Sequence, residues 1–65
     1  MTNDLENLTK ILHSIQFAIS DLKQVIQSEN LLLVELAMSS LKNLADEEAK
    51  ITRLISILEI SNKAN

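Results

Sequence analysis

The sequence contains no cysteine, no glycine and no proline, and Phe17 is its one aromatic residue. Without cysteine the chain forms no disulfide, and its single histidine, His13, lacks the neighbouring ligands that a zinc site needs. Without glycine the chain lacks the residue that phosphate-binding loops and two-residue β-hairpin turns require. These absences argue against most small β-rich and metal-stabilised folds.

Basic charge and long apolar runs are also scarce. Six basic residues stand against nine acidic ones, a net charge of −3, and the basic residues are scattered. Nucleic-acid-binding proteins usually concentrate basic residues on one surface. The longest apolar run, Leu31–Val34, is far shorter than the roughly 20 residues of a membrane span. Because the N-terminus is also unlike a signal peptide, we expect a cytoplasmic protein with no membrane span and no nucleic-acid partner.

The short length makes stability the main problem for this chain. Its 65 residues form a single domain, and a chain of this size buries only about 60% of its unfolded surface. Small folds are usually reinforced by disulfides, a metal or another chain. A hydrophobic fraction of 46% is too high for disorder. With no cysteine and no metal ligand set, we expect association with another chain or unusually good helix packing.

The first half of the chain carries an apolar stripe at alternating steps of three and four residues, which is typical of an amphipathic helix with coiled-coil-like packing. The stripe consists of Leu5, Leu8, Leu12, Ile15, Ile19, Leu22 and Ile26. Ile11, Ala18 and Val25 flank it at seven-residue intervals. The widened stripe suits a helical bundle better than a two-stranded coil.

The second half carries its own stripe in a separate register, and Glu48 is its one residue that is not apolar. The stripe consists of Val34, Ala37, Leu41, Leu44, Glu48, Ile51, Ile55 and Leu58. A single helix with a stutter would span about 90 Å and bury its stripe only against other chains. The pattern instead favours an all-α fold, an antiparallel hairpin of two long amphipathic helices packed with another chain as a helical bundle.

Two positions compete for the turn of this hairpin. The polar segment 28–30 contains turn and N-cap residues and predicts helices over 3–27 and 31–61. Met38–Ser40, where a serine would cap the second helix, predicts helices over 3–37 and 40–61. Local chemistry favours the first position, and a third break at 46–48 is disfavoured because the periodicity runs through it. The polar tail 62–65 is expected to fray.

Several apolar residues fall outside the predicted core, which contains Ile51, Leu54, Ile55 and Leu58. Phe17 lies nearly opposite the first stripe, as a docking point or as an isolated exposed side chain. The segment 31–36 is apolar around a full helical turn. Surplus apolar surface of this kind usually marks an interface. The candidate partner-binding residues are Phe17, Leu31, Leu32, Leu33, Val34, Leu36, Ile57 and Ile60.

No group of residues indicates catalysis. Asp46, Glu47 and Glu48 are consecutive, and consecutive helical residues point about 100° apart, so their carboxylates do not converge. One hairpin also provides no pocket and no glycine-built oxyanion loop. We therefore expect no enzymatic activity, no cofactor, no metal and no small-molecule substrate.

Residues 8–59 resemble the N-terminal helical hairpin of FlgN-like flagellar export chaperones. Three segments match the leucine-rich heptads and glutamates of that family: 25–33 (VIQSENLLL), 41–48 (LKNLADEE) and 51–59 (ITRLISILE). The resemblance implies a turn near 38–40 and a role in covering an aggregation-prone amphipathic helix. Those chaperones are about twice as long, and in size and acidity this chain is also similar to the small co-chaperones of type III secretion needles.

Three functions follow from these observations. The first is a cytosolic chaperone or adaptor that covers an amphipathic helix of a secretion or flagellar partner. The second is a structural protein that self-assembles into a four-helix bundle. The third is an RNA-binding bundle similar to the plasmid regulator Rop, which needs a basic stripe. Lys10 and Lys23 lie near one another around the helix, but acidic residues neighbour both.

Overall fold

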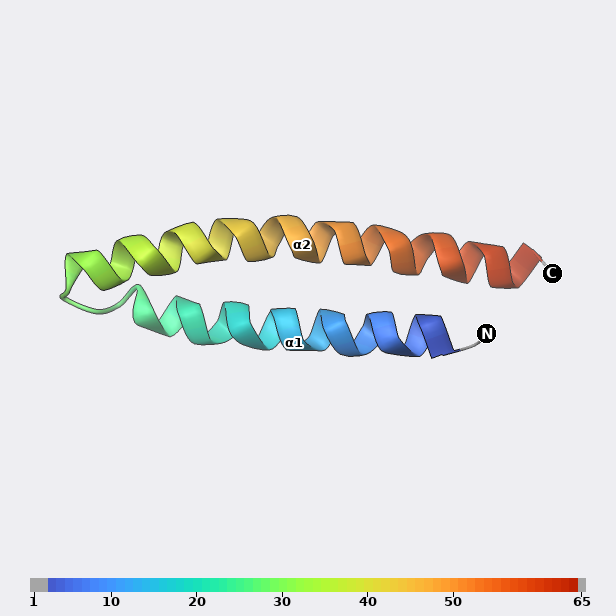
Figure 1. The fold of residues 1–65 in the computed structure, drawn as a ribbon, viewed down its shortest axis with the longest axis horizontal. Helices are drawn as coiled ribbons and strands as arrows, with labels where there is room; N and C mark the ends of the chain where they lie inside the picture. Colours follow the sequence, from blue (N-terminus) through green and yellow to red (C-terminus); the bar gives the residue numbers. More distant parts are fainter. Residues whose placement is uncertain (1–2, 65) are drawn as a thin grey trace.

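Two long helices run antiparallel and pack side by side along a rod of 53 × 15 × 13 Å (Figure 1). The computed structural model describes residues 3–64, with side chains for residues 3–61. Helix α1 spans Asn3–Val25 and helix α2 spans Leu31–Ala64, and residues 3–64 contain no strand. The prediction of an all-α antiparallel hairpin is confirmed.

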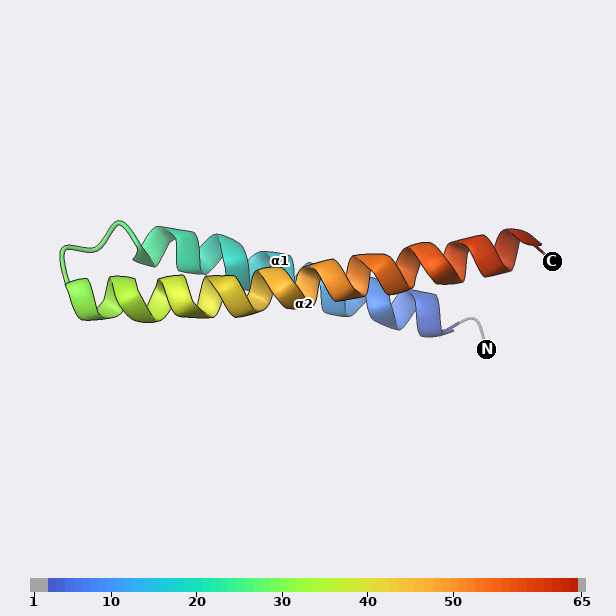
Figure 2. The same cartoon turned by 90° about the horizontal axis from the view of Figure 1, so that it is seen from above.

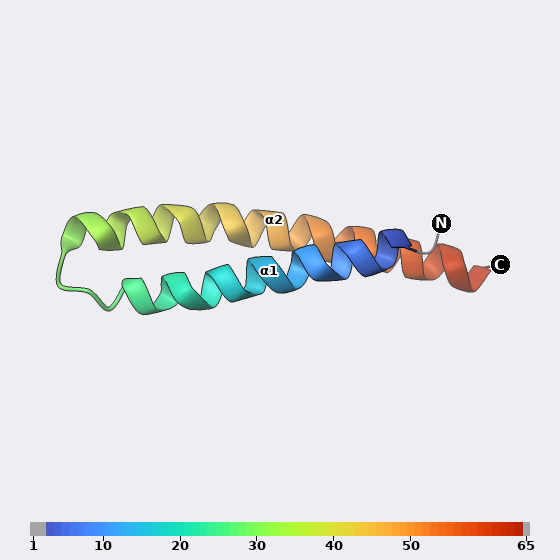
Figure 3. The same cartoon turned by 60° about the horizontal axis from the view of Figure 1, so that its bottom comes forward.

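The two helices cross at a shallow angle rather than lying strictly parallel. Figure 2 shows α1 passing from one side of α2 to the other along the rod, and Figure 3 shows the same crossing from an oblique direction. A shallow crossing is expected when stripes that repeat every 3.5 residues pack together, since this repeat drifts around a helix of 3.6 residues per turn. The crossing keeps the two stripes in contact along most of the hairpin.

The chain turns at residues 26–30, the first of the two predicted positions. The side-chain oxygen Oδ1 of Asn30 accepts hydrogen bonds from the backbone N–H groups of Leu32 (3.0 Å) and Leu33 (3.4 Å). The backbone N–H of Asn30 donates to the hydroxyl of Ser28 at 3.0 Å. Asn30 therefore satisfies two N–H groups that every helix start leaves without an intrahelical partner, and it caps α2.

The alternative turn at Met38–Ser40, which the family resemblance also implies, is wrong. Helix α2 continues through this segment, and Met38 and both of the following serines are exposed. A serine is a good cap only where a helix begins, and α2 is already capped by Asn30, nine residues before Ser39. The helices predicted over 3–37 and 40–61 are therefore absent.

The C-terminal ends of both helices differ slightly from the predicted bounds. Helix α1 ends at Val25 rather than 27, because Gln27 N–H donates to the Gln24 carbonyl (3.2 Å) and Ser28 N–H to the Val25 carbonyl (2.9 Å), which tightens the last turn. Helix α2 continues to Ala64, beyond the predicted end at 61, since neither glycine nor proline stops it. The fraying expected of the tail 62–65 falls partly outside the described residues.

The core of the hairpin is small. Among the described side chains, Ala37 at 2% and Ile51 at 8% exposure are the only buried ones. The other stripe residues of both helices are mostly half-buried, because two helices enclose one line of contact and leave both sides of it open. The hairpin thus buries far less apolar surface than its sequence supplies.

Candidate interaction surface

The two predicted stripes face each other and form the seam of the hairpin. Every stripe residue of α2 from Val34 to Leu58, and every one of α1 from Leu5 to Leu22, is buried or half-buried. Glu48, the polar exception, accepts a hydrogen bond from Gln16 Nε2 at 3.1 Å. Its carboxylate thus reaches across the seam to α1 instead of lying unpaired within it.

The hairpin has two flanks, one on each side of the seam. Because a helix turns in one sense by about 100° per residue, residues that precede a stripe residue lie on one side of the stripe, and residues that follow it lie on the other. The two antiparallel helices are related by a near two-fold axis perpendicular to the plane that contains them. Rotation about this axis exchanges α1 and α2 and keeps each side of that plane in place, so the preceding residues of both helices lie on the same side of the hairpin.

Large apolar residues gather on the side formed by the preceding residues. We call this surface the apolar flank: Ile11, Ala18 and Val25 of α1, with Leu33, Leu36, Leu54 and Ile57 of α2. Its six larger side chains are between 37% and 66% exposed, so the hairpin itself covers only part of each one. Between the apolar residues of α2, the same side carries Ser40, Asn43, Glu47 and Lys50.

The opposite flank is polar along α1 and mixed along α2. Gln16, Ser20 and Lys23 of α1 line a depression there together with Glu48 of α2. Leu31 and Met38 are the large apolar residues on this flank, both in the part of α2 nearer the turn. The opposite flank therefore lacks a continuous apolar surface.

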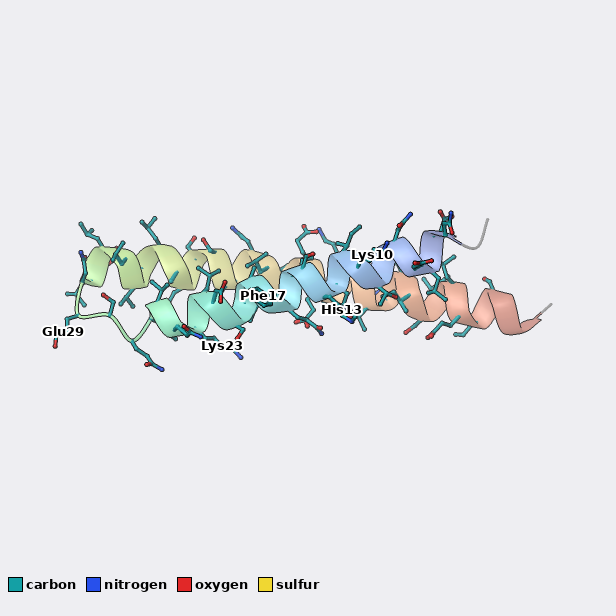
Figure 4. All side chains as sticks on the ribbon, turned by 90° about the horizontal axis from the view of Figure 1, so that it is seen from below. Lys10, His13, Phe17, Lys23 and Glu29 are labelled. Carbon is teal, nitrogen blue, oxygen red and sulfur yellow. The ribbon has the colours of Figure 1, made fainter. Side chains whose placement is uncertain are left out.

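The predicted partner-binding residues do not come together on one surface. Leu33, Leu36 and Ile57 lie on the apolar flank, whereas Val34 is half-buried in the seam. Phe17, at 71% exposure, lies on the outer surface of α1, where it lines an open depression with His13 (Figure 4). Leu31 and Leu32 lie in the first turn of α2, and Ile60 lies near its other end. These four exposed residues are therefore dispersed.

Sequence reasoning missed four members of the apolar flank. Leu54 was expected in the core, but it is 48% exposed. Ile11, Ala18 and Val25 were recognised as widening the first stripe and were not assigned to a partner surface. The signal that identifies them is positional: each immediately precedes a stripe residue, as Leu33 precedes Val34.

Two exposed ion pairs join charged residues close together on the same helix. Glu47 lies 3.6 Å from Lys50, and Glu6 lies 3.8 Å from Lys10. Glu47 and Glu48 therefore turn to different partners, as expected of consecutive helical residues. Within residues 3–64, no three or more histidine, aspartate or glutamate side chains gather where they would hold a metal ion. In the same part of the chain, neither helix is long and apolar enough to cross a membrane.

Comparison with protein-family models, with curated proteins and with solved structures finds no match to this chain. The resemblance to flagellar export chaperones therefore stays a prediction from the three sequence segments. The later turn that this resemblance implies is absent from the hairpin. The basis for a functional proposal is therefore the exposed apolar surface of the hairpin.

Proposed function

We propose that this chain is a small helical binding protein whose apolar flank packs against amphipathic helices. One observation carries the proposal: a hairpin with two buried side chains presents six large, partly exposed apolar residues along a single side. Exposed apolar residues scattered singly are normal on a soluble protein. A row of them beside an incomplete core is typical of an interaction surface.

The energetics support a partner on this flank. Covering the exposed half of a leucine or isoleucine contributes about 1 kcal/mol, so six such residues offer several kcal/mol. A free energy of this size is a large fraction of the stability of a small domain. A helix laid along the flank would cover these residues and also the open side of the seam, as in other helix-in-groove complexes.

A chaperone or adaptor of a secretion or flagellar system is the specific form of this proposal. Its support is the acidic, short hairpin with an unfilled apolar surface, together with the three resembling segments. In this role the chain would act in the cytoplasm and cover an amphipathic helix of its client until that helix assembles elsewhere.

The proposal is tested with a labelled amphipathic peptide of three heptads, with leucine on its stripe and lysine and glutamate elsewhere. Fluorescence anisotropy measures its binding to the wild type, to Leu36→Gln and to Leu31→Gln. Both residues are strongly exposed leucines of α2, but Leu36 lies on the apolar flank and Leu31 on the opposite flank. Glutamine keeps the helix propensity close to that of leucine, so the pair isolates the surface.

We expect Leu36→Gln to weaken peptide binding at least about fivefold, since a shift of 1 kcal/mol corresponds to roughly that factor. Leu31→Gln is expected to change binding less than about twofold. Equal effects of the two variants, or no binding to the folded wild type at a concentration where it is monomeric, would contradict the proposal.

A further inference from the structure

We propose that the apolar flank binds a second copy of this chain in antiparallel orientation, closing a four-helix bundle. The inference rests on the proposed function and names the partner of the same surface. It comes from a symmetry in the placement of the apolar residues. Each helix carries this symmetry by itself, and the contacts between the helices bring the two centres of symmetry to one level.

The flank residues of α2 are arranged symmetrically around residue 45. Leu33 and Ile57 lie 12 residues on either side of it, and Leu36 and Leu54 lie nine residues on either side. The inner positions are polar on both sides of the centre: Ser40 and Lys50 are five residues away, and Asn43 and Glu47 are two residues away. From either end of α2, the flank therefore begins with apolar residues, continues with polar ones and ends with apolar ones.

The flank residues of α1 have their own centre at Ala18. Ile11 and Val25 lie seven residues on either side of it. The hydrogen bond from Gln16 Nε2 to Glu48 Oε2, at 3.1 Å, sets these two residues within about one helical turn of each other along the rod. Because the helices are antiparallel, Ala18 then lies within about one turn of residue 46, close to the centre in α2.

A two-fold axis at this common level would superimpose apolar on apolar residues. It places Leu33 against the second copy's Ile57, and Leu36 against the second copy's Leu54. Ala18, a small residue, lies at the centre and allows close approach of the two copies. In the same arrangement Asn43 meets the second copy's Glu47, a hydrogen-bonding pair in the polar middle of the flank. A polar pair of this kind specifies register in helical bundles.

Only the antiparallel arrangement uses the symmetry of α2. In a parallel pair the two-fold axis runs along the rod, so α2 of one copy lies over α1 of the other. The four large apolar flank residues of α2 would then meet only two large apolar residues of α1, Ile11 and Val25. The antiparallel arrangement instead sets each charge against a neutral polar residue, and Lys50 keeps its own pairing with Glu47 at 3.6 Å.

The size of the flank matches what a stable dimer needs. One side of a rod 53 Å long and 15 Å wide has roughly 800 Å², the area that each partner of a standard protein interface buries. The absence of cysteine, glycine and proline leaves the association of helices as the available way to enlarge the small core.

Sedimentation velocity and light scattering of the full chain give the first test, with the monomer mass being 7.3 kDa. We expect a species of twice that mass at micromolar concentration. Leu36→Gln should raise its dissociation constant at least about tenfold, and Leu31→Gln less than about twofold. Circular dichroism at high concentration checks that each variant remains helical.

Cysteine cross-linking gives the orientation, because the natural chain contains no cysteine that would interfere. Leu36→Cys and Leu54→Cys chains are mixed and oxidised, one of them carrying an affinity tag. The antiparallel dimer yields the mixed disulfide, because it brings the two positions within the 4.4–6.8 Å Cα separation that a disulfide requires. A parallel dimer keeps positions 36 and 54 about 27 Å apart along the rod and yields no mixed disulfide. Leu31→Cys serves as the control that should remain uncross-linked.

The outcomes separate this inference from the proposed function. A monomeric chain that still binds the amphipathic peptide through Leu36 overturns the second copy as partner and leaves the binding function intact. A monomeric chain that binds no peptide overturns both. A dimer that gives no mixed disulfide, or that responds equally to the Leu36 and Leu31 substitutions, overturns the antiparallel arrangement through the apolar flank.

Discussion

The apolar flank and the opposite flank lie on the two sides of the same seam between α1 and α2. They nevertheless differ in chemistry: six large apolar residues lie on one and two on the other. Folding of the hairpin alone requires the stripes and makes no distinction between the flanks. The difference therefore points to a contact beyond the hairpin.

The seam supports both flanks, and its disruption should have the largest effect. Ile51→Ala removes most of one of the two buried side chains, and a substitution of this type costs about 2–5 kcal/mol. In a hairpin with so small a core, this loss should abolish the cooperative thermal transition seen by circular dichroism. Ile60→Ala, at an exposed position of the same helix, is the control and should leave the transition nearly unchanged. Comparable effects of the two substitutions would argue against the seam.

The position of the turn decides which residues share a flank, so a turn elsewhere would change the composition of both flanks. Asn30→Ala removes the cap of α2 and should lower the free energy of unfolding by about 1 kcal/mol. Ser39→Ala should stabilise the chain slightly, since alanine is the better residue within a helix. Chemical denaturation measures both. If the turn instead lay at Met38–Ser40, a serine would cap the second helix. Ser39→Ala would then lower the free energy of unfolding, and Asn30→Ala would change it little.

Phe17 lies outside both flanks, so its substitution should have the smallest effect on stability and association. Its side chain is largely exposed on the outer surface of α1, so Phe17→Ala should change the free energy of unfolding by less than about 0.5 kcal/mol. We expect dimer mass and peptide binding to remain as in the wild type. A dimer that dissociates on this substitution would place the interface on the outer surface of α1 instead of on the apolar flank.

The stripe spacing predicted the fold because the constraint is local. Steps of three and four place side chains on one face of a helix whatever surrounds it, and the two registers required two separate faces. The cap at Asn30 was also predictable, since asparagine after a polar segment and before an apolar run is a known helix start. The sequence did not exclude Met38–Ser40, because serines can cap a helix or lie exposed within one.

The surface was predicted less well than the fold. Phe17, Leu36 and Ile57 were expected to be exposed and are exposed. Leu54 was expected in the core and is exposed, whereas Val34, assigned both to the second stripe and to the partner surface, lies half-buried in the seam. Leucine and valine occur equally on a seam and on an interface, so their type carries no information about which of the two they join. Only the angular distance from the seam distinguishes them.

By itself the sequence determined that this chain forms two amphipathic helices and that its core would be small. These properties depend on neighbours within one or two helical turns. The tertiary structure decided that the turn lies at residues 26–30, that Glu48 reaches Gln16 across the seam, and that Ile11, Leu36 and Leu54 lie on one side. These properties depend on how the two antiparallel helices are aligned and oriented against each other. That alignment is established only when residues far apart in the chain pack together.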